Sequence, residues 1–263
     1  MTFDLADTTG LPVSFDAETG GLIFAPPLPA PEPATRAPER LRAVYRHPQA
    51  LDEFEDKSLY LMYDGVALPE HGRAIAEAGL RYDLTVLPHA MIGDEPIKTL
   101  GHYHTAASDG LPYPELYQVV LGCTYFVLQL AGAPDYRVED TMVVEARAGE
   151  VVLMPPGWGH VSVNAGDAPL VMCNWIASAC DTVPEPYLAR GGAAWHVVCA
   201  VHGLQLVPNP RYEAPGAVTR QRGARGIPGF IAPGPIYALG VADLGALRPL
   251  VEPTAYDWGA VGF

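Results

Sequence analysis

The chain has 263 residues, of which 49% are hydrophobic and 17% are charged, and its formal net charge at pH 7 is −14. This length fits one large all-β domain or two smaller ones, and it can bury a sizeable core. The acidic balance argues against nucleic acid and anionic membranes as partners, because both need a positive surface.

The first 38 residues predict a hairpin followed by an arm. Val13 to Phe24 is rich in β-branched and aromatic residues around Thr19-Gly20-Gly21, which predicts a β-hairpin. The segment from 25 to 38 is rich in proline and predicts an extended linker or an arm on another surface. Residues 1–12 fit an ordered segment or a disordered tail equally well. They carry acidic residues where a secretory signal would be basic, so we expect a cytoplasmic protein with reduced cysteines.

Residues 39–212 predict the main structural unit, which begins with short helices and continues with strands. PERLRAVYRHPQALDEF and LPEHGRAIAEAGL have the apolar period of short helices. The strand candidates are YDLTVLPHAMI, IKTLGHYH, ELYQVVLGCTYFVLQL, TMVVEARAGEVVLMP, HVSVNAG and PLVMCNWIAS. Many short strands without intervening helices predict an antiparallel barrel or sandwich. Residues 213–263 are again rich in Gly and Pro, and we expect a C-terminal extension packed on the barrel.

Two histidines lie two positions apart near the end of one predicted strand. Residues two apart in a strand face the same side, so His102 and His104 point together and Tyr103 points away. Two imidazoles on one strand face are a good start for a divalent-metal site. The alternative is a pair of solvated surface histidines.

Two further patterns surround this pair. Glu115 is followed by six residues and then Gly122, although ten residues separate it from His104. The stretch GEVVLMPPGWGHVSVN places Gly149, Pro155, Gly157, His160 and Asn164 at fixed spacings. Together these spacings resemble the two motifs of the cupin superfamily, and the late Glu115 is the one departure.

The cupin resemblance implies an all-β fold, a double-stranded β-helix or jelly-roll barrel, carrying short N-terminal helices and the C-terminal extension. It also implies a metal bound by His102, His104, Glu115 and His160. A set of three imidazoles and one carboxylate suits Fe2+, Mn2+, Zn2+, Ni2+ or Co2+ and leaves positions open for substrate or water. The alternative is that these histidines are structural.

A narrower resemblance covers residues 39–212. DKSLYLMYDGVAL, RYDLTVLPHAMIGDEPIKTLGHYH, YPELYQVVLG, PPGWGHVSVNAGDAPLVMCNW and VPNPRY are similar to the cupin-type glucose-6-phosphate isomerases of archaea and some bacteria. The resemblance implies a homodimeric, metal-dependent enzyme of glycolysis and gluconeogenesis that interconverts glucose 6-phosphate and fructose 6-phosphate. The positions that match the family's sugar-phosphate contacts are Thr85, Thr99 and Gly101. Tyr113 and Glu115 match the aromatic residue and the carboxylate beside the reacting carbons.

An aldose–ketose isomerisation needs a Lewis acid and a base that moves a proton between C1 and C2. We expect the metal to supply the first and Glu115 the second, with Tyr113 beside the enediol. Tyr117 is a further candidate substrate contact. The nearest basic candidates for the phosphate are Lys98 and Arg81.

Two departures from the family bear on the substrate. The loop TAASDGLPYP, residues 105–114, is longer than its family counterpart and is expected to rim the pocket. The family's Asp-x-x-His-x-Tyr segment is replaced by ACDTVPEPY, where Asp181 has a counterpart but the His and Tyr are absent, and Tyr187 is the candidate replacement. The alternatives left open are a metallocupin of another reaction, such as an epimerase, a lyase or an Fe-dependent oxygenase, and a non-catalytic sugar-binding cupin.

Overall fold

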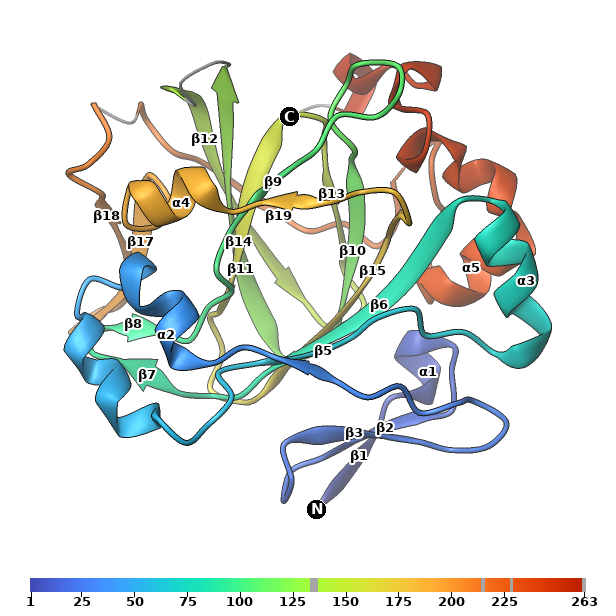
Figure 1. Ribbon diagram of the computed structural model, residues 1–263, viewed down its shortest axis with the longest axis horizontal. Helices are drawn as coiled ribbons and strands as arrows, with labels where there is room; N and C mark the ends of the chain where they lie inside the picture. Colours follow the sequence, from blue (N-terminus) through green and yellow to red (C-terminus); the bar gives the residue numbers. More distant parts are fainter. Residues whose placement is uncertain (133–136, 214–215, 228, 262–263) are drawn as a thin grey trace.

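The fold is built around two β-sheets that close into a barrel and are antiparallel except for the pair β12–β19 (Figure 1). This computed structural model describes residues 1–132, 137–213, 216–227 and 229–261. The six-stranded sheet contains, in spatial order, β13 (Val151–Met154), β10 (Glu115–Leu121), β15 (Leu170–Ala177), β6 (Leu80–Leu87), β5 (Leu61–Tyr63) and β4 (Ala34–Thr35). The four-stranded sheet contains β14 (Trp158–Asn164), β11 (Cys123–Gly132), β12 (Arg137–Arg147) and β19 (Thr219–Arg222).

The segment that carries the two closely spaced histidines runs along the free edge of β14. Isolated bridges join Lys98 to Val163 and His102 to His160, and the segment continues into β9 (Tyr103–His104). One sheet therefore has the order β13-β10-β15-β6, and the other runs from this segment through β14 and β11 to β12. This interleaving of consecutive strands between two sheets is the jelly-roll arrangement of cupins, so the predicted fold class is confirmed.

The apolar core explains why the central strands are apolar on both faces. In β10, Tyr117 and Val119 belong to the core between the sheets, whereas Leu116 and Val120 pack against chain segments outside the barrel. A strand covered on both faces reads as a nearly continuous apolar run. This explains why apolar and polar residues alternate only weakly in the β10 sequence ELYQVVL.

The outer face of β10, β15 and β6 is covered by residues 229–261, which we call the C-terminal segment. The indole Nε1 of Trp175 donates a hydrogen bond of 2.8 Å to the carbonyl of Ile236. Tyr237 stacks on the same indole, with ring centroids 5.9 Å apart. Gln118 Oε1 also accepts from the Ile236 amide at 3.0 Å. The C-terminal segment is thereby fixed to the central strands of the sheet.

Smaller elements complete the molecule. The predicted hairpin from 13 to 24 is confirmed: β2 (Val13–Asp16) pairs with β3 (Gly21–Phe24), and β1 (Thr2–Asp4) extends this sheet. Hence residues 2–4 are ordered rather than part of a free tail. The remaining strands are β7 (Met91–Ile92), β8 (Glu95–Pro96), β16 (Thr182–Val183), β17 (Trp195–Ala200) and β18 (Gly203–Pro208).

The helices are short. The second predicted helix is confirmed as α3 (Pro69–Glu77). The first is only partly helical, because α2 (Pro38–Leu41) gives way to the 3-10 turns η1 (Arg42–Val44) and η2 (Pro48–Phe54), and Pro48 cannot donate a backbone hydrogen bond. The others are α1 (Ala6–Thr9), α4 (Glu185–Ala189), α5 (Ile236–Ala242), η3 (Leu244–Leu250), η4 (Pro253–Ala255) and η5 (Trp258–Val261).

Candidate active site

Four predicted ligand residues come together inside the barrel. His102 and His104 come from the strand segment beside β14, Glu115 is the first residue of β10, and His160 lies in β14. One possible ligand atom from each side chain lies within 4.8 Å of the others. The Nε2 atoms of His104 and His160 each lie 3.4 Å from Glu115 Oε2. We refer to these four residues as the four-residue cluster.

The long loop between His104 and Glu115 folds back on itself. The amide of Tyr113 donates to the carbonyl of Thr105 at 3.0 Å, and the amide of Ala107 donates to the carbonyl of Leu111 at 2.7 Å. We call residues 105–113 the rim hairpin. Because its two ends meet, Glu115 returns beside His104 despite the ten intervening residues.

Several polar atoms of the four-residue cluster have no partner. Glu115 Oε2, His104 Nε2 and His160 Nδ1 are buried and accept or donate no hydrogen bond within the described part of the chain. His104 Nδ1 donates to the carbonyl of Tyr113 at 2.8 Å, which leaves the lone pair on Nε2 facing the cluster. Buried polar atoms without partners are costly, and a divalent cation would satisfy them.

The protonation of the cluster also suits a cation. Burial lowers the pKa of His102 and of His160 well below the usual value, and the neighbouring imidazoles lower both further. These rings are therefore neutral near pH 7, which is the form that binds metals. Three imidazoles and one carboxylate form a donor set that fits a divalent metal ion.

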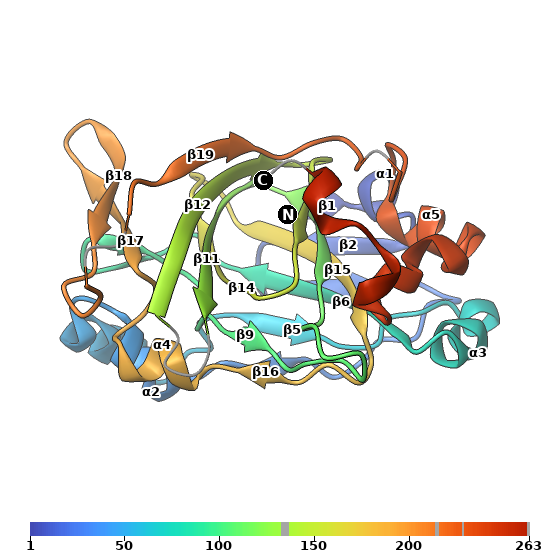
Figure 2. The same cartoon turned by 90° about the horizontal axis from the view of Figure 1, so that it is seen from above.

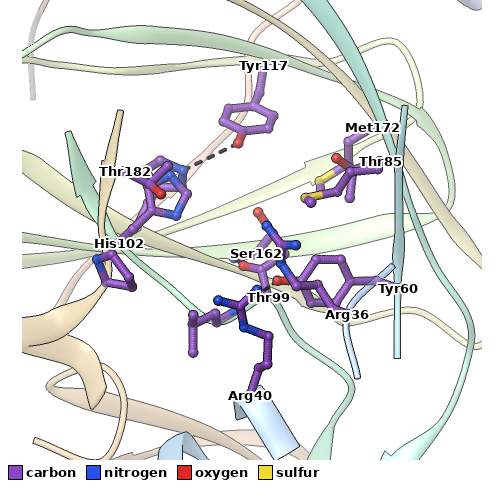
Figure 3. A pocket seen from close by; sticks show the side chains of 14 residues that line it. Arg36, Arg40, Tyr60, Thr85, Thr99, His102, Tyr117, Ser162, Met172 and Thr182 are labelled. Carbon is purple, nitrogen blue, oxygen red and sulfur yellow. Dashed lines mark hydrogen bonds between the residues drawn. The ribbon is translucent and has the colours of Figure 1, made fainter. Parts of the chain in front are cut away.

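A cavity of about 170 Å³ adjoins the cluster. His102 and His160 form part of its wall, so the cluster is open to a small molecule in the cavity (Figure 3). The lining residues are Arg36, Arg40, Tyr60, Met62, Thr85, Thr99, Leu100, His102, Tyr117, His160, Ser162, Met172, Thr182 and Pro184.

Two arginines that the sequence analysis missed line this cavity. Arg36 is half-buried beside Tyr60, with its Cζ 6.0 Å from the ring centroid, and Arg40 lies across the cavity from Tyr117 (Figure 3). Both follow β4, which reaches the barrel by pairing with β5. The basic residues named from the sequence lie elsewhere: Lys98 is buried against Glu95, and Arg81 Nε binds Asp83 at 2.8 Å.

Hydroxyl groups also line the cavity. The predicted residues Thr85 and Thr99 are among them, and Thr99 Oγ1 accepts from the Ser162 amide at 2.9 Å. Ser162 and Thr182 were not predicted. Ser162 follows His160 by two positions on β14, so strand periodicity alone could have identified it.

The predicted aromatic contacts divide into two groups. Tyr117 lines the cavity, and its hydroxyl lies 3.4 Å from His160 Nε2 (dashed line in Figure 3). Burial, and then the charge of Glu115, raises the Tyr117 pKa well above its usual value, so the phenol stays protonated. The side chain of Tyr113 packs instead with Ala107 and Ile176.

Tyr187 and Gly101 lie behind the cavity wall. Tyr187 is fully buried in α4, with its ring centroid 5.3 Å from that of Tyr103. Gly101 has φ +83°, and a Cβ there would lie 2.6 Å from Val161 Cγ2 and 2.7 Å from Tyr187 Cδ1. A glycine is therefore required at 101 by both backbone conformation and packing. The structure does not bring Tyr187 to the cavity, and its substrate contact stays a prediction.

The segment that departs from the family lies at the cavity. β16 pairs with β9 (Figure 2). Thr182 of β16 and Pro184 just after it line the cavity together with His102 and His160. No helix in the described residues is long and apolar enough to cross a membrane.

Comparisons with known proteins agree with this geometry. A family model described as glucose-6-phosphate isomerase (GPI) matches residues 35–208. Three relatives carry the name glucose-6-phosphate isomerase. The Thermococcus onnurineus protein is 29% identical over 161 residues, covering 60% of this chain and 74% of that protein. The Pyrococcus abyssi protein is 24% identical over 189 residues, covering 71% and 92%. The Pyrococcus furiosus protein is 26% identical over 167 residues, covering 63% and 80%.

Solved structures add little to this comparison. Hazelnut vicilin from Corylus avellana aligns with a TM-score of 0.35 and 15% identity, over 47% of this chain and 32% of that chain, which is too distant to support a conclusion. The family match covers well over half of the chain and includes every member of the four-residue cluster. The chain belongs to the glucose-6-phosphate isomerase family.

Proposed function

We propose that this protein is a metal-dependent aldose–ketose isomerase that interconverts glucose 6-phosphate and fructose 6-phosphate. The observation that carries the proposal is the make-up of the cavity. His102 and His160 of the four-residue cluster line the cavity, and so do the two arginines. The cluster also holds buried ligand atoms without hydrogen-bond partners within the described residues. A phosphorylated sugar has carbonyl and hydroxyl groups for the cluster and a dianionic phosphate for the arginines. The relatives named glucose-6-phosphate isomerase support the same assignment.

The four-residue cluster is proposed to hold one divalent ion per chain, and the candidates are Fe2+, Mn2+, Zn2+, Ni2+ and Co2+. When bound, the ion supplies Lewis-acid polarisation of the sugar carbonyl and its neighbouring hydroxyl. Glu115 has two oxygens, and Oε2 lies nearest the histidines. We propose that this carboxylate both binds the ion and acts as a base beside it.

Glu115 is proposed to move the proton between C1 and C2 through an enediol. In the direction of the ketose, the proton on C2 passes to a carboxylate oxygen and returns to C1, while the proton of the C2 hydroxyl passes to the C1 oxygen. The carboxylate is thereby regenerated. The protonated phenol of Tyr117 is the aromatic donor that lines the cavity. Tyr113, the aromatic residue predicted for this role, acts in this proposal through its carbonyl, which orients His104.

The phosphate is proposed to bind at the other end of the cavity, between Arg36 and Arg40. Arginine recognises phosphate through several charge-assisted hydrogen bonds, and Thr85 and Thr99 add hydroxyl groups beside it. Gly101, the third residue predicted to contact the phosphate, is not among the residues that line the cavity, so its contact stays a prediction. Within the cell we propose a cytoplasmic homodimer that serves glycolysis and gluconeogenesis.

A coupled assay on metal-loaded protein tests this function. Purified protein is stripped with a chelator, reloaded with each first-row divalent metal, and given glucose 6-phosphate or fructose 6-phosphate. The proposal expects turnover that disappears with the chelator and returns with metal. If no sugar phosphate is isomerised with any of these ions, the proposal is wrong.

A further inference from the structure

The rim hairpin connects two residues of the four-residue cluster. His104 immediately precedes it, and Glu115 lies two residues after it. The carbonyl of Tyr113, the last residue of the hairpin, accepts the hydrogen bond from His104 Nδ1 at 2.8 Å. The conformation of the hairpin therefore determines the orientation of His104 as well as the return of Glu115.

The base of the hairpin is fixed to the barrel. The amide of Thr105 donates to the carbonyl of Asp181 at 3.0 Å, and Thr105 Oγ1 accepts from the Asp181 amide at 3.1 Å. The tip is much more exposed: Asp109 and Gly110 are solvent-exposed, and Leu111 is 37% exposed. Without an outside contact, the tip would be held only by bonds within the hairpin.

An outside contact comes from the C-terminal segment, 145 positions away. Asp109 Oδ2 accepts two hydrogen bonds from Thr254, one of 2.9 Å from its amide and one of 2.8 Å from its hydroxyl. Asp109 Oδ1 accepts from the Leu111 amide at 3.2 Å. Bonds to a carboxylate are stronger than bonds between neutral groups. The amide of Thr254 contributes most to a lowered Asp109 pKa, so the carboxylate is ionised at neutral pH.

Apolar packing acts in the same direction. Ala107 and Tyr113 of the hairpin form a small core with Ile176 and Cys180, and Val251 of the C-terminal segment packs against it. Figure 1 shows the loop after β9 beside the C-terminal segment. That segment is itself fixed to β10 and β15 through Ile236, as described above. The hairpin tip is thus tied through the C-terminal segment to the same sheet that carries Glu115.

We propose that Asp109 and Thr254 are positioning residues for the metal site: their contact holds the rim hairpin so that the Tyr113 carbonyl orients His104 toward the cluster. The inference rests on the metal site of the proposed function, and it adds a role for the C-terminal segment. If the contact is lost, the chain populates hairpin conformations in which His104 is misoriented. The apparent metal affinity then falls in proportion to the fraction of molecules in which His104 is correctly oriented.

The test compares Zn2+ affinity, measured by competition with a chromogenic chelator, among matched variants. Asp109→Ala removes both bonds from Thr254 and the bond from the Leu111 amide, and it is expected to weaken Zn2+ binding about 10-fold or more. Thr254→Val removes only the hydroxyl bond and is expected to give a smaller loss of Zn2+ affinity. Thr254→Ser keeps the hydroxyl and should retain the wild-type affinity. Asp167→Ala removes an exposed acid in another turn and controls for net charge.

A second readout separates positioning from general stability. Amide hydrogen exchange of the metal-free protein should become faster in residues 105–113 of Asp109→Ala and stay unchanged in β10 and β15. Equal Zn2+ affinity in wild type, Asp109→Ala and Thr254→Val would overturn the proposal. So would unchanged exchange in the hairpin. Neither measurement uses a sugar, so a failed isomerase assay leaves this test intact, and a failed test here leaves the isomerase assignment standing.

Discussion

Two buried clusters in this protein combine a glutamate with histidine, and they differ in how their polar atoms are satisfied. One is the four-residue cluster at the cavity. The other, which we call the Glu95 cluster, joins Glu95, Lys98 and His196, which are 0%, 6% and 4% exposed. In the four-residue cluster, Glu115, His104 and His160 are buried to a similar extent, at 3%, 7% and 1% exposed.

In the Glu95 cluster the carboxylate is fully paired. Glu95 Oε1 accepts from Lys98 Nζ and from His196 Nδ1, the latter at 3.0 Å, and Oε2 accepts from the Arg46 amide at 2.7 Å. Burial alone would raise its pKa, but the charge of Lys98 and the bond from His196 outweigh burial and lower it to about 2.

The four-residue cluster has no such internal pairing. Its carboxylate and two of its imidazoles keep buried atoms without partners within the described residues, and burial lowers the pKa of His102 and of His160. A buried cluster that is internally satisfied stabilises one conformation, whereas one with convergent unpartnered donors is suited to a ligand. The comparison teaches that hydrogen-bond satisfaction, more than composition, distinguishes a structural cluster from a binding site.

The largest expected effect separates the two clusters by their histidines. His160→Ala should abolish both bound metal and turnover, because it removes one of four ligands, while His196→Ala should keep one metal per chain. Metal content after dialysis, measured by inductively coupled plasma mass spectrometry, and the coupled assay check this. Full metal occupancy in His160→Ala would remove His160 from the ligand set.

The next effect separates metal binding from proton transfer. Glu115→Gln keeps an oxygen that can bind the ion, so most metal should remain, but it removes the base. We expect kcat to fall by about 10²–10⁴-fold, with Glu77→Gln on the exposed face of α3 as the control. A rate equal to wild type would refute the role of Glu115 as the base.

The Glu95 cluster predicts a pH dependence of stability. The pKa of Glu95 is lowered from 4.5 to about 2, so the unfolded chain binds its proton at higher pH than the folded chain does. The stability that Glu95 contributes is present above pH 4.5 and is lost as the pH falls toward 2, and it amounts to about 3 kcal/mol.

Urea unfolding of metal-free wild type and Glu95→Gln across this pH range measures the effect. The wild-type free energy of unfolding should fall more steeply with acid than that of the variant. Parallel curves would show that Glu95 is not paired in solution.

The smallest expected effect concerns the two arginines that line the cavity. Arg36→Ala should raise KM for glucose 6-phosphate about 10-fold, since it removes a charge-assisted bond to phosphate, and it should leave metal content unchanged. Arg42→Ala is a matched control, because Arg42 belongs to the same segment but binds Asp52 at 2.7 Å. An unchanged KM in Arg36→Ala would exclude it from the phosphate site.

The sequence predicts those parts of the site that depend on local strand geometry. The pairing of His102 with His104 follows from period-two alternation. The cupin resemblance, which rests on the spacing around His160, implies that His160 and Glu115 join them. The same alternation extends to Ser162. The run of short strands predicts a barrel or a sandwich, and the resemblance to cupins implies the jelly-roll barrel, which the structure confirms.

The parts that depend on distant pairing were not predictable from residues alone. Arg36 reaches the cavity because β4 pairs with β5, a contact that no local pattern specifies. The same holds for Thr254 and Asp109, which are 145 positions apart. Tyr113 directs its carbonyl rather than its phenol to the site, because the rim hairpin turns its side chain into a small apolar core.

Anomalous diffraction from crystals loaded with Zn2+ tests directly whether the four-residue cluster is the metal site. We expect one strong peak among His102, His104, Glu115 and His160, about 2.0–2.2 Å from the coordinating atoms, and none at the Glu95 cluster. Metal-loaded, active crystals with no peak among these four side chains would contradict it.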